Sequence, residues 1–107
     1  ATGEDAVAEL NRIADMAAVY GLPMANHNTG SQVMSYATIQ WAASIQDYIA
    51  CETITGQGGW MDQLLVLNGP YIRNGFITLP DKPGLGITFR VQQAKAHLAE
   101  EDRGFFD

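Results

Sequence analysis

Hydrophobic and polar positions follow two alternating spacings in the first half of the chain. Over residues 4–20, apolar side chains recur every three or four positions, which predicts an amphipathic helix that ends at Gly21. Residues 22–26 form a short apolar run, long enough for a strand and too short for a helix. Ser31 can cap a second helix over residues 33–45, whose apolar positions cover nearly every side. We expect this second helix to be buried on more than one side.

The same order repeats before the pattern changes. Residues 48–51 are a second short apolar run, which ends at Glu52, and a helical pattern over residues 60–67 follows a Gly-rich connection. Helix, buried strand, helix, buried strand, helix is the order of a parallel α/β protein. We expect residues 1–68 to form the first part of a single domain.

The remainder, residues 69–107, has a different pattern of hydrophobic and turn-forming residues. The stretch "GPYIRNGFITLPDKPGLGITF" contains an Asn74-Gly75 turn signal between two β-prone runs, and its prolines and glycines then indicate an extended crossing segment. Apolar positions over residues 91–98 predict a last helix. Three acidic residues follow at its C-terminal end, where the helix dipole disfavours negative charge, so we expect that end to fray.

Length, charge and cysteine content exclude several classes of protein. A chain of 107 residues with 47% hydrophobic residues suits one globular domain, and a formal net charge of −6 argues against nucleic-acid binding. No apolar run approaches the roughly 18 residues of a membrane-spanning helix, and the first residues lack the order of a signal peptide. We therefore expect a cytoplasmic protein with no membrane partner. The single cysteine, Cys51, permits no internal disulfide.

His27 and Glu52 are the candidate catalytic residues, because each directly follows a predicted strand. In parallel α/β proteins the strand-to-helix loops converge at the carboxyl ends of the strands, which would bring this imidazole and this carboxylate to one edge of one sheet. A histidine can take a proton from carbon or return one, and a nearby carboxylic acid can donate a hydrogen bond to an oxyanion. The competing interpretation is a surface or capping histidine beside a solvated glutamate, and the residues alone leave both open.

Four other residues are candidates for substrate binding. Asn26, Asn28 and Ser31 are polar and flank the histidine, and Trp60 follows the Gly-rich connection closely enough to touch a substrate. Packing is nevertheless the more common role of a tryptophan in a small domain.

Two further signals are weaker. The sequence "TGQGG" at residues 55–59 could cradle a phosphate with its backbone amides, but it lacks the Lys and Ser/Thr of a P-loop, so a mobile loop over the mouth of the site is the better interpretation. Cys51 next to His27 could suggest a thiol nucleophile. Strand alternation points Cys51 away from the site, however, which favours a buried, inert thiol.

The stretches "RIADMAAVYGLPMANH", "YIACE" and "GFITLPDKPGLGITF", in this order, carry a resemblance to a known family. Together they resemble the C-terminal portion of the enolase superfamily, in its mandelate racemase-like (mandelate racemase/muconate lactonizing enzyme) branch. The resemblance implies the last part of a modified TIM (β/α)8 barrel, with residues 22–26 as strand seven and residues 48–51 as strand eight. It further implies that His27 is the general base or acid at the substrate α-carbon and that Glu52 donates a hydrogen bond to the developing enediolate.

The resemblance also implies a reaction and partners. The reaction is abstraction of a proton α to a carboxylate by a Mg²⁺-dependent acid-sugar dehydratase, racemase or cycloisomerase, with the Mg²⁺ ligands outside these residues. Because two strands cannot close a barrel, the remaining strands and a capping domain must come in cis or from another chain. We expect a homo-oligomer and no activity from this chain alone. The alternative function is a non-catalytic α/β module that acts through association.

Overall fold

The computed structural model describes residues 6–53 and 59–107. The elements follow in the order α1 (Ala6–Val19), β1 (Met24–Asn26), α2 (Gln32–Ala42), β2 (Tyr48–Cys51), the 3₁₀ helix η1 (Trp60–Gln63), α3 (Val91–Lys95) and the 3₁₀ helix η2 (Glu100–Asp102). The first four elements confirm the predicted alternation of helix and strand, with each boundary within three residues of its expected position. Helical spacing and short apolar runs were therefore sufficient signals in this half of the chain.

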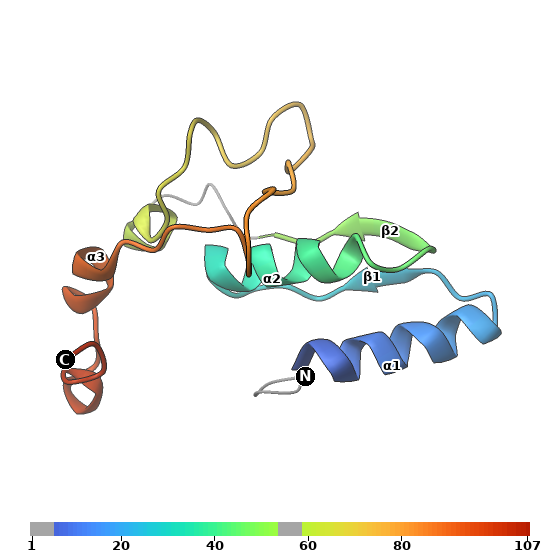
Figure 1. The fold of residues 1–107 in the computed structure, drawn as a ribbon, viewed down its shortest axis with the longest axis horizontal. Helices are drawn as coiled ribbons and strands as arrows, with labels where there is room; N and C mark the ends of the chain where they lie inside the picture. Colours follow the sequence, from blue (N-terminus) through green and yellow to red (C-terminus); the bar gives the residue numbers. More distant parts are fainter. Residues whose placement is uncertain (1–5, 54–58) are drawn as a thin grey trace.

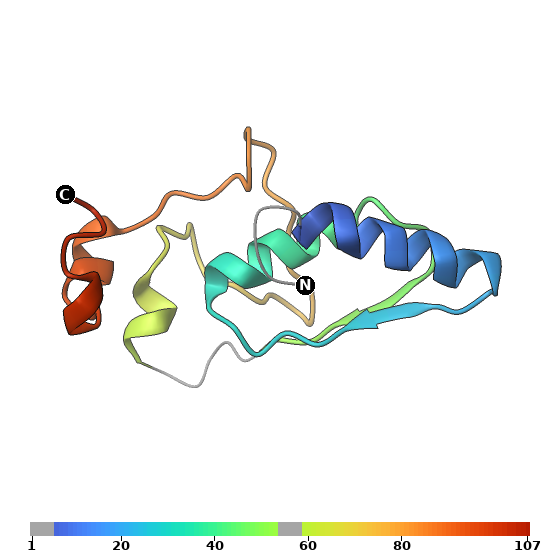
Figure 2. The same ribbon diagram turned by 90° about the horizontal axis from the view of Figure 1, so that it is seen from below.

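The two strands form a parallel pair. Met24 lies opposite Tyr48, Ala25 opposite Ala50 and Asn26 opposite Cys51, with an irregularity after the first of these pairs. Figure 2 shows α1 and α2 on the same side of the strands, so that one face of the sheet is covered and the other is bare. This is the arrangement expected when helices alternate with parallel strands, because each helix must pack back onto the sheet.

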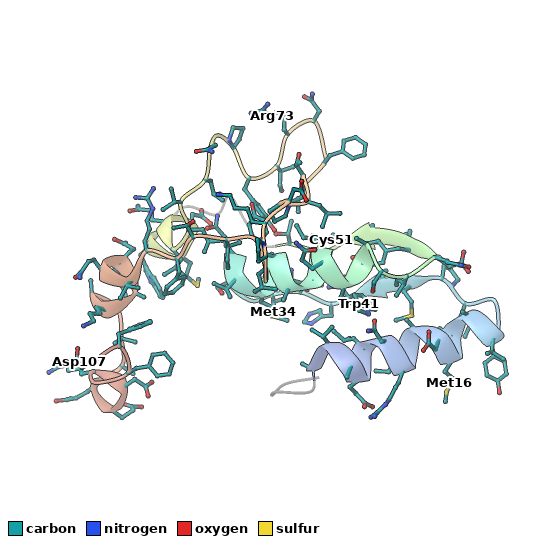
Figure 3. The ribbon with its side chains drawn as sticks, viewed as in Figure 1. Met16, Met34, Trp41, Cys51, Arg73 and Asp107 are labelled. Atoms are coloured by element: carbon teal, nitrogen blue, oxygen red, sulfur yellow. The ribbon has the colours of Figure 1, made fainter. Side chains whose placement is uncertain are left out.

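Helix α2 lies at the centre of the fold. Its Trp41 is 2% exposed and packs edge-on against Tyr48 of β2, with ring centroids 5.9 Å apart. Figure 3 shows Trp41 on the side of α2 that faces β1 and α1. Tyr36 and Ile39 form a second buried cluster with Leu65, which comes from beyond the strands. The prediction that this helix is buried on more than one side is therefore confirmed.

The segment after η1 is mostly extended and crosses back over α2 (Figure 1). The expected helix over residues 60–67 is wrong beyond Gln63, because Leu65 pairs in antiparallel fashion with Phe89. The Val66 amide donates to the Thr88 carbonyl at 2.9 Å, and the Arg90 amide donates to the Leu64 carbonyl at 2.7 Å. A short two-stranded contact thus replaces the last helical turn.

The predicted Asn74-Gly75 turn is present. Asn74 has φ of 53° and Gly75 has φ of 79°, and Arg73 and Phe76 exchange backbone hydrogen bonds at 2.9 and 3.0 Å. Positive φ at both central residues is the property of the tight hairpin turn that an Asn-Gly pair favours. Figure 3 shows Arg73 far out on the arc of this segment, away from the helices.

The end of the chain differs from the expected single helix. Helix α3 stops at Lys95, and the acidic residues Glu100 to Asp102 form the separate turn η2. Negative charge is unfavourable at a helix C-terminus and favourable in a first turn, which explains the break before them. The terminal Asp107 bonds to Lys95 at 2.6 Å and so holds this end against α3. Within the described ranges, no helix is both long and apolar enough to cross a membrane.

Candidate active site

The two candidate catalytic side chains meet at the carboxyl ends of the paired strands. His27 follows β1 directly and Glu52 follows β2 directly, and His27 Nε2 lies 3.9 Å from Glu52 Oε2. The two side chains are 78% and 48% exposed, respectively, so both reach solvent in this chain. Parallel pairing of the two strands is what brings them together, since an antiparallel pair would place them at opposite edges.

A hollow of about 410 Å³ lies between these strand ends. Its walls are Ala25, Asn26, His27, Ala50, Cys51 and Glu52. Two larger hollows, of about 600 and 690 Å³, lie elsewhere, one beside Tyr71 and Arg90 and the other between α1 and the residues before β2. We take the smallest of the three as the candidate active site, because a base and a carboxyl group converge only there among them.

Glu52 is held from the neighbouring strand end. The backbone N–H of Asn28 donates a hydrogen bond to Glu52 Oε2 at 2.8 Å. The Asn28 side chain is fully buried, and its Nδ2 donates to Ser35 Oγ at 3.0 Å. As placed, this side chain has no surface left with which to touch a ligand. The sequence pointed to Asn28 as a binding residue but gave no such role to Ser35, although a serine within an otherwise apolar helix was the available signal.

Asn26 lines the hollow and is fixed by the other strand. The Tyr48 hydroxyl donates a hydrogen bond to Asn26 Oδ1. Burial raises the pKa of Tyr48, and the adjacent Cys51 thiol raises it further, so the hydroxyl keeps its proton near neutrality and remains a donor. The Asn26 Nδ2 group is the part of this amide available to a ligand.

The structure does not bring Ser31 and Trp60 into the hollow. Ser31 occupies the N-cap position of α2, but its side chain makes no capping hydrogen bond, and its carbonyl instead accepts from the Ser35 amide and hydroxyl. Trp60 stacks on His97, with ring centroids 4.4 Å apart. Binding of substrate by Ser31 or Trp60 stays a prediction.

Cys51 packs toward the protein interior. It contacts the cluster of Tyr36, Ile39 and Leu65, and its Sγ lies 3.5 Å from the Glu52 carbonyl oxygen. The thiol is half-buried, not fully buried as expected, and Cys51 is also one of the residues that line the hollow. Most of the "TGQGG" stretch falls outside the described residues.

The side chains present do not form a metal site by themselves. Across residues 6–53 and 59–107, no three histidine, cysteine, aspartate or glutamate side chains lie close enough together to hold a metal ion. The Mg²⁺ that the resemblance implies therefore does not fit these residues alone.

Comparison with known proteins agrees with this geometry. The family described as enolase C-terminal domain-like matches residues 6–94, which include both strands, both strand-end residues and the whole crossing segment. The chain belongs to this family. The enolase C-terminal domain-like fold accounts for the small parallel sheet with helices on one face.

Two relatives give this family membership more detail. A D-xylonate dehydratase from Haloferax volcanii is 38% identical over 97 residues, which are 91% of this chain and 23% of that protein. The crystal structure of a mandelate racemase/muconate lactonizing enzyme-like protein from Rubrobacter xylanophilus superposes with a TM-score of 0.79 at 30% identity, over 88% of this chain and 24% of that one. The enolase C-terminal domain-like chain thus spans about a quarter of the length of either relative, and its resemblance to the mandelate racemase-like branch is confirmed.

Proposed function

We propose that this chain is the C-terminal barrel segment of an acid-sugar dehydratase, in which His27 and Glu52 act on a substrate carboxylate. The single observation that carries the proposal is the 3.9 Å approach of His27 Nε2 to Glu52 Oε2 at adjacent parallel strand ends. A relative named D-xylonate dehydratase, 38% identical, favours dehydration of a sugar acid over the other reactions of the branch. In this proposal β1 and β2 are strands seven and eight of a modified TIM barrel.

The reaction assigns each residue one task. A neutral His27 imidazole removes the proton α to the carboxylate, and the electron pair of the C–H bond enters the resulting enediolate. A protonated Glu52 donates a hydrogen bond to an enediolate oxygen, where the developing charge makes that bond strongest. The imidazolium then gives its proton to the departing β-hydroxyl group, which leaves as water with the C–O electron pair. The enol that remains rearranges to a 2-keto acid.

The rest of the enzyme would supply what these residues lack. A Mg²⁺ ion, bound by carboxylates outside this chain, would stabilise negative charge on the substrate. The remaining barrel strands and a capping domain would come from the same polypeptide or from another chain, and we propose that the complete enzyme forms a homo-oligomer. The tasks proposed for His27 and Glu52 do not require either residue, or any other in this segment, to bind the Mg²⁺ ion.

The test uses the complete protein that contains these residues, with D-xylonate and a panel of related sugar acids as probes. In deuterium oxide, the wild type should exchange the α-proton and release a 2-keto acid, whereas His27→Asn should do neither while binding Mg²⁺ unchanged. Thr29→Ala, which alters an exposed side chain in the same loop, is the matched control and should exchange normally. Exchange that persists in His27→Asn would overturn the role of His27, and inversion without 2-keto acid would indicate a racemase.

Glu52 is tested separately. Glu52→Gln keeps the shape of the side chain but removes the acidic proton, so kcat should fall more than KM rises, since the lost hydrogen bond is worth most in the transition state. An unchanged kcat would return Glu52 to the role of a solvated loop residue.

A second function, association without catalysis, is favoured by a different observation. Val19, Leu22 and Ile49 are exposed at the outer end of α1 and along the strands, and such apolar surface marks an interface. These residues serve equally well as contacts with the rest of a barrel. A complete protein that binds sugar acids without any α-proton exchange would favour the non-catalytic function.

A further inference from the structure

Glu52 has an unusual support for a side chain with its proposed task. A glutamate side chain has several freely rotating bonds, and nearly half of this one is exposed, so holding it in one orientation costs conformational entropy. The bond from the Asn28 N–H at 2.8 Å provides this restraint. Because the donor is a backbone group, its position is only as fixed as the loop that carries it.

That loop is anchored by the buried side chain of Asn28. Its Nδ2 donates to Ser35 Oγ in α2 at 3.0 Å, and its Oδ1 accepts from the Gly30 amide at 3.4 Å. The Ser35 hydroxyl donates in turn to the Ser31 carbonyl at 3.3 Å, one turn earlier in the helix. Asn28 and Ser35 are both fully buried, so water does not compete for these bonds. The first turn of α2, the loop after β1 and the carboxyl group after β2 are therefore linked.

We infer that Asn28 is a positioning residue that, together with Ser35, fixes the Glu52 carboxyl group so that its Oε1 faces the substrate. This inference rests on the proposed function, because it concerns how Glu52 performs its task. Oε2 accepts from the Asn28 N–H and faces His27 Nε2, which leaves Oε1 as the oxygen that carries the proton and donates a hydrogen bond to the enediolate. Asn28 thus acts through Glu52 and does not touch the substrate.

The main test measures steady-state kinetics of the complete enzyme with D-xylonate. Asn28→Ala and Ser35→Ala should each lower kcat, on the order of 10²-fold, with little change in KM, because a misplacement of about 1 Å has a cost of that size. Ser44→Ala is the matched control, since Ser44 is an exposed serine just beyond the other end of α2, and its kcat should be unchanged. Ser35→Thr keeps a hydroxyl group that can accept the hydrogen bond from Asn28, so its kcat should stay close to that of the wild type.

A double-mutant cycle separates positioning from a general structural role. If Asn28 acts through Glu52, then Asn28→Ala should lower kcat no further in a Glu52→Gln background. If Asn28 has only a structural role, Asn28→Ala should lower kcat in the Glu52→Gln background as well. The melting temperature should then fall together with kcat. The cycle remains informative if Ser35→Ala fails to fold, because Asn28→Ala alone completes it.

The outcomes distinguish the two proposals. Wild-type kcat in both Asn28→Ala and Ser35→Ala, with an impaired Glu52→Gln, would overturn the positioning role and leave the proposed function intact. Additive losses in the cycle would also overturn it. If the wild-type protein leaves every sugar acid unchanged, the proposed function is overturned. The positioning role of Asn28 is then overturned as well, because it depends on that function.

Discussion

Residues 6–52 and residues 59–107 differ in how much regular secondary structure they contain. The first region is a succession of two helices and two paired strands, and it contains both His27 and Glu52. The second contains only short helical turns and isolated strand contacts, joined by long extended stretches (Figure 1). Six of its apolar side chains belong to the cluster that includes Tyr36 and Ile39 of α2 or pack against it; they are Leu65, Leu67, Tyr71, Ile77, Ile87 and Phe89.

The difference shows how each region contributes to the site. The first region satisfies many of its backbone hydrogen-bonding groups within its own helices and strand pair, which fixes the strand ends and hence His27 and Glu52. The second region packs against α2 and against the cluster that Cys51 of β2 also contacts, so it supports the site from behind that helix and strand. Tyr71 illustrates this contact, since its ring lies 5.5 Å from that of Tyr36. Mutations should therefore have large effects where α2 meets either region and small effects along the outer arc.

The largest expected effect is on the chain expressed alone. One face of the sheet is bare, and apolar side chains such as Val19, Leu22 and Ile49 are exposed, so the isolated 107 residues should self-associate and lack a cooperative thermal transition. Size-exclusion chromatography with circular dichroism on heating measures both properties. A monodisperse monomer with a sharp thermal transition would show that the bare sheet face and the exposed apolar side chains need no partner. The contrast drawn between the two regions would then be wrong.

Trp41 should give the next largest effect. Trp41→Ala removes a ring that is 2% exposed and packs on Tyr48, and should lower the free energy of unfolding of the complete protein by about 4 kcal/mol. Trp60→Ala is the matched control from the second region, because Trp60 is 39% exposed and contacts mainly His97. Urea unfolding measures both. An equal loss in the two variants would contradict the view that α2 is the common support.

Leu65 tests the contact between the two regions. Leu65→Ala removes a side chain that is 2% exposed between Tyr36 and Ile39, and should destabilise the complete protein by about 3 kcal/mol. Leu79→Ala, in the exposed part of the crossing segment, should cost much less. If the second region only lies loosely on α2, the two variants will unfold at the same urea concentration.

The sequence was informative where the determinants are local. Helical spacing, short apolar runs and the residues that end them were enough to predict β1, α2 and β2, and the rule that parallel strands share a carboxyl edge then placed His27 beside Glu52. The Asn74-Gly75 turn was equally local, because the φ preferences of these two residues nearly specify it.

The failures have a common physical cause. Leu65 pairs with Phe89, more than twenty residues away, and this contact overrides a helical pattern that looked adequate locally. The bond between Asn28 and Ser35 depends on burial and side-chain rotamers that only the packed helix determines. From the sequence, Asn28 was therefore expected to bind substrate, although its side chain is enclosed in the structure. Glu52 was expected to take part in the reaction, and its hydrogen bond with the Asn28 backbone was not foreseen.

The smallest expected effect lies on the outer arc. Gly75 has φ of 79°, but a Cβ placed there would meet no atom within 4 Å, so Gly75→Ala costs only the strain of a left-handed backbone, about 1 kcal/mol. Asn74→Gly at the preceding turn position relieves the same kind of strain and is the matched control, expected to leave stability nearly unchanged. Neither variant should alter kcat, because neither turn residue is among those that line the hollow. A kcat in Gly75→Ala reduced as far as in Asn28→Ala would show that the crossing segment acts directly on His27 and Glu52, and the two regions would then have to be treated as one.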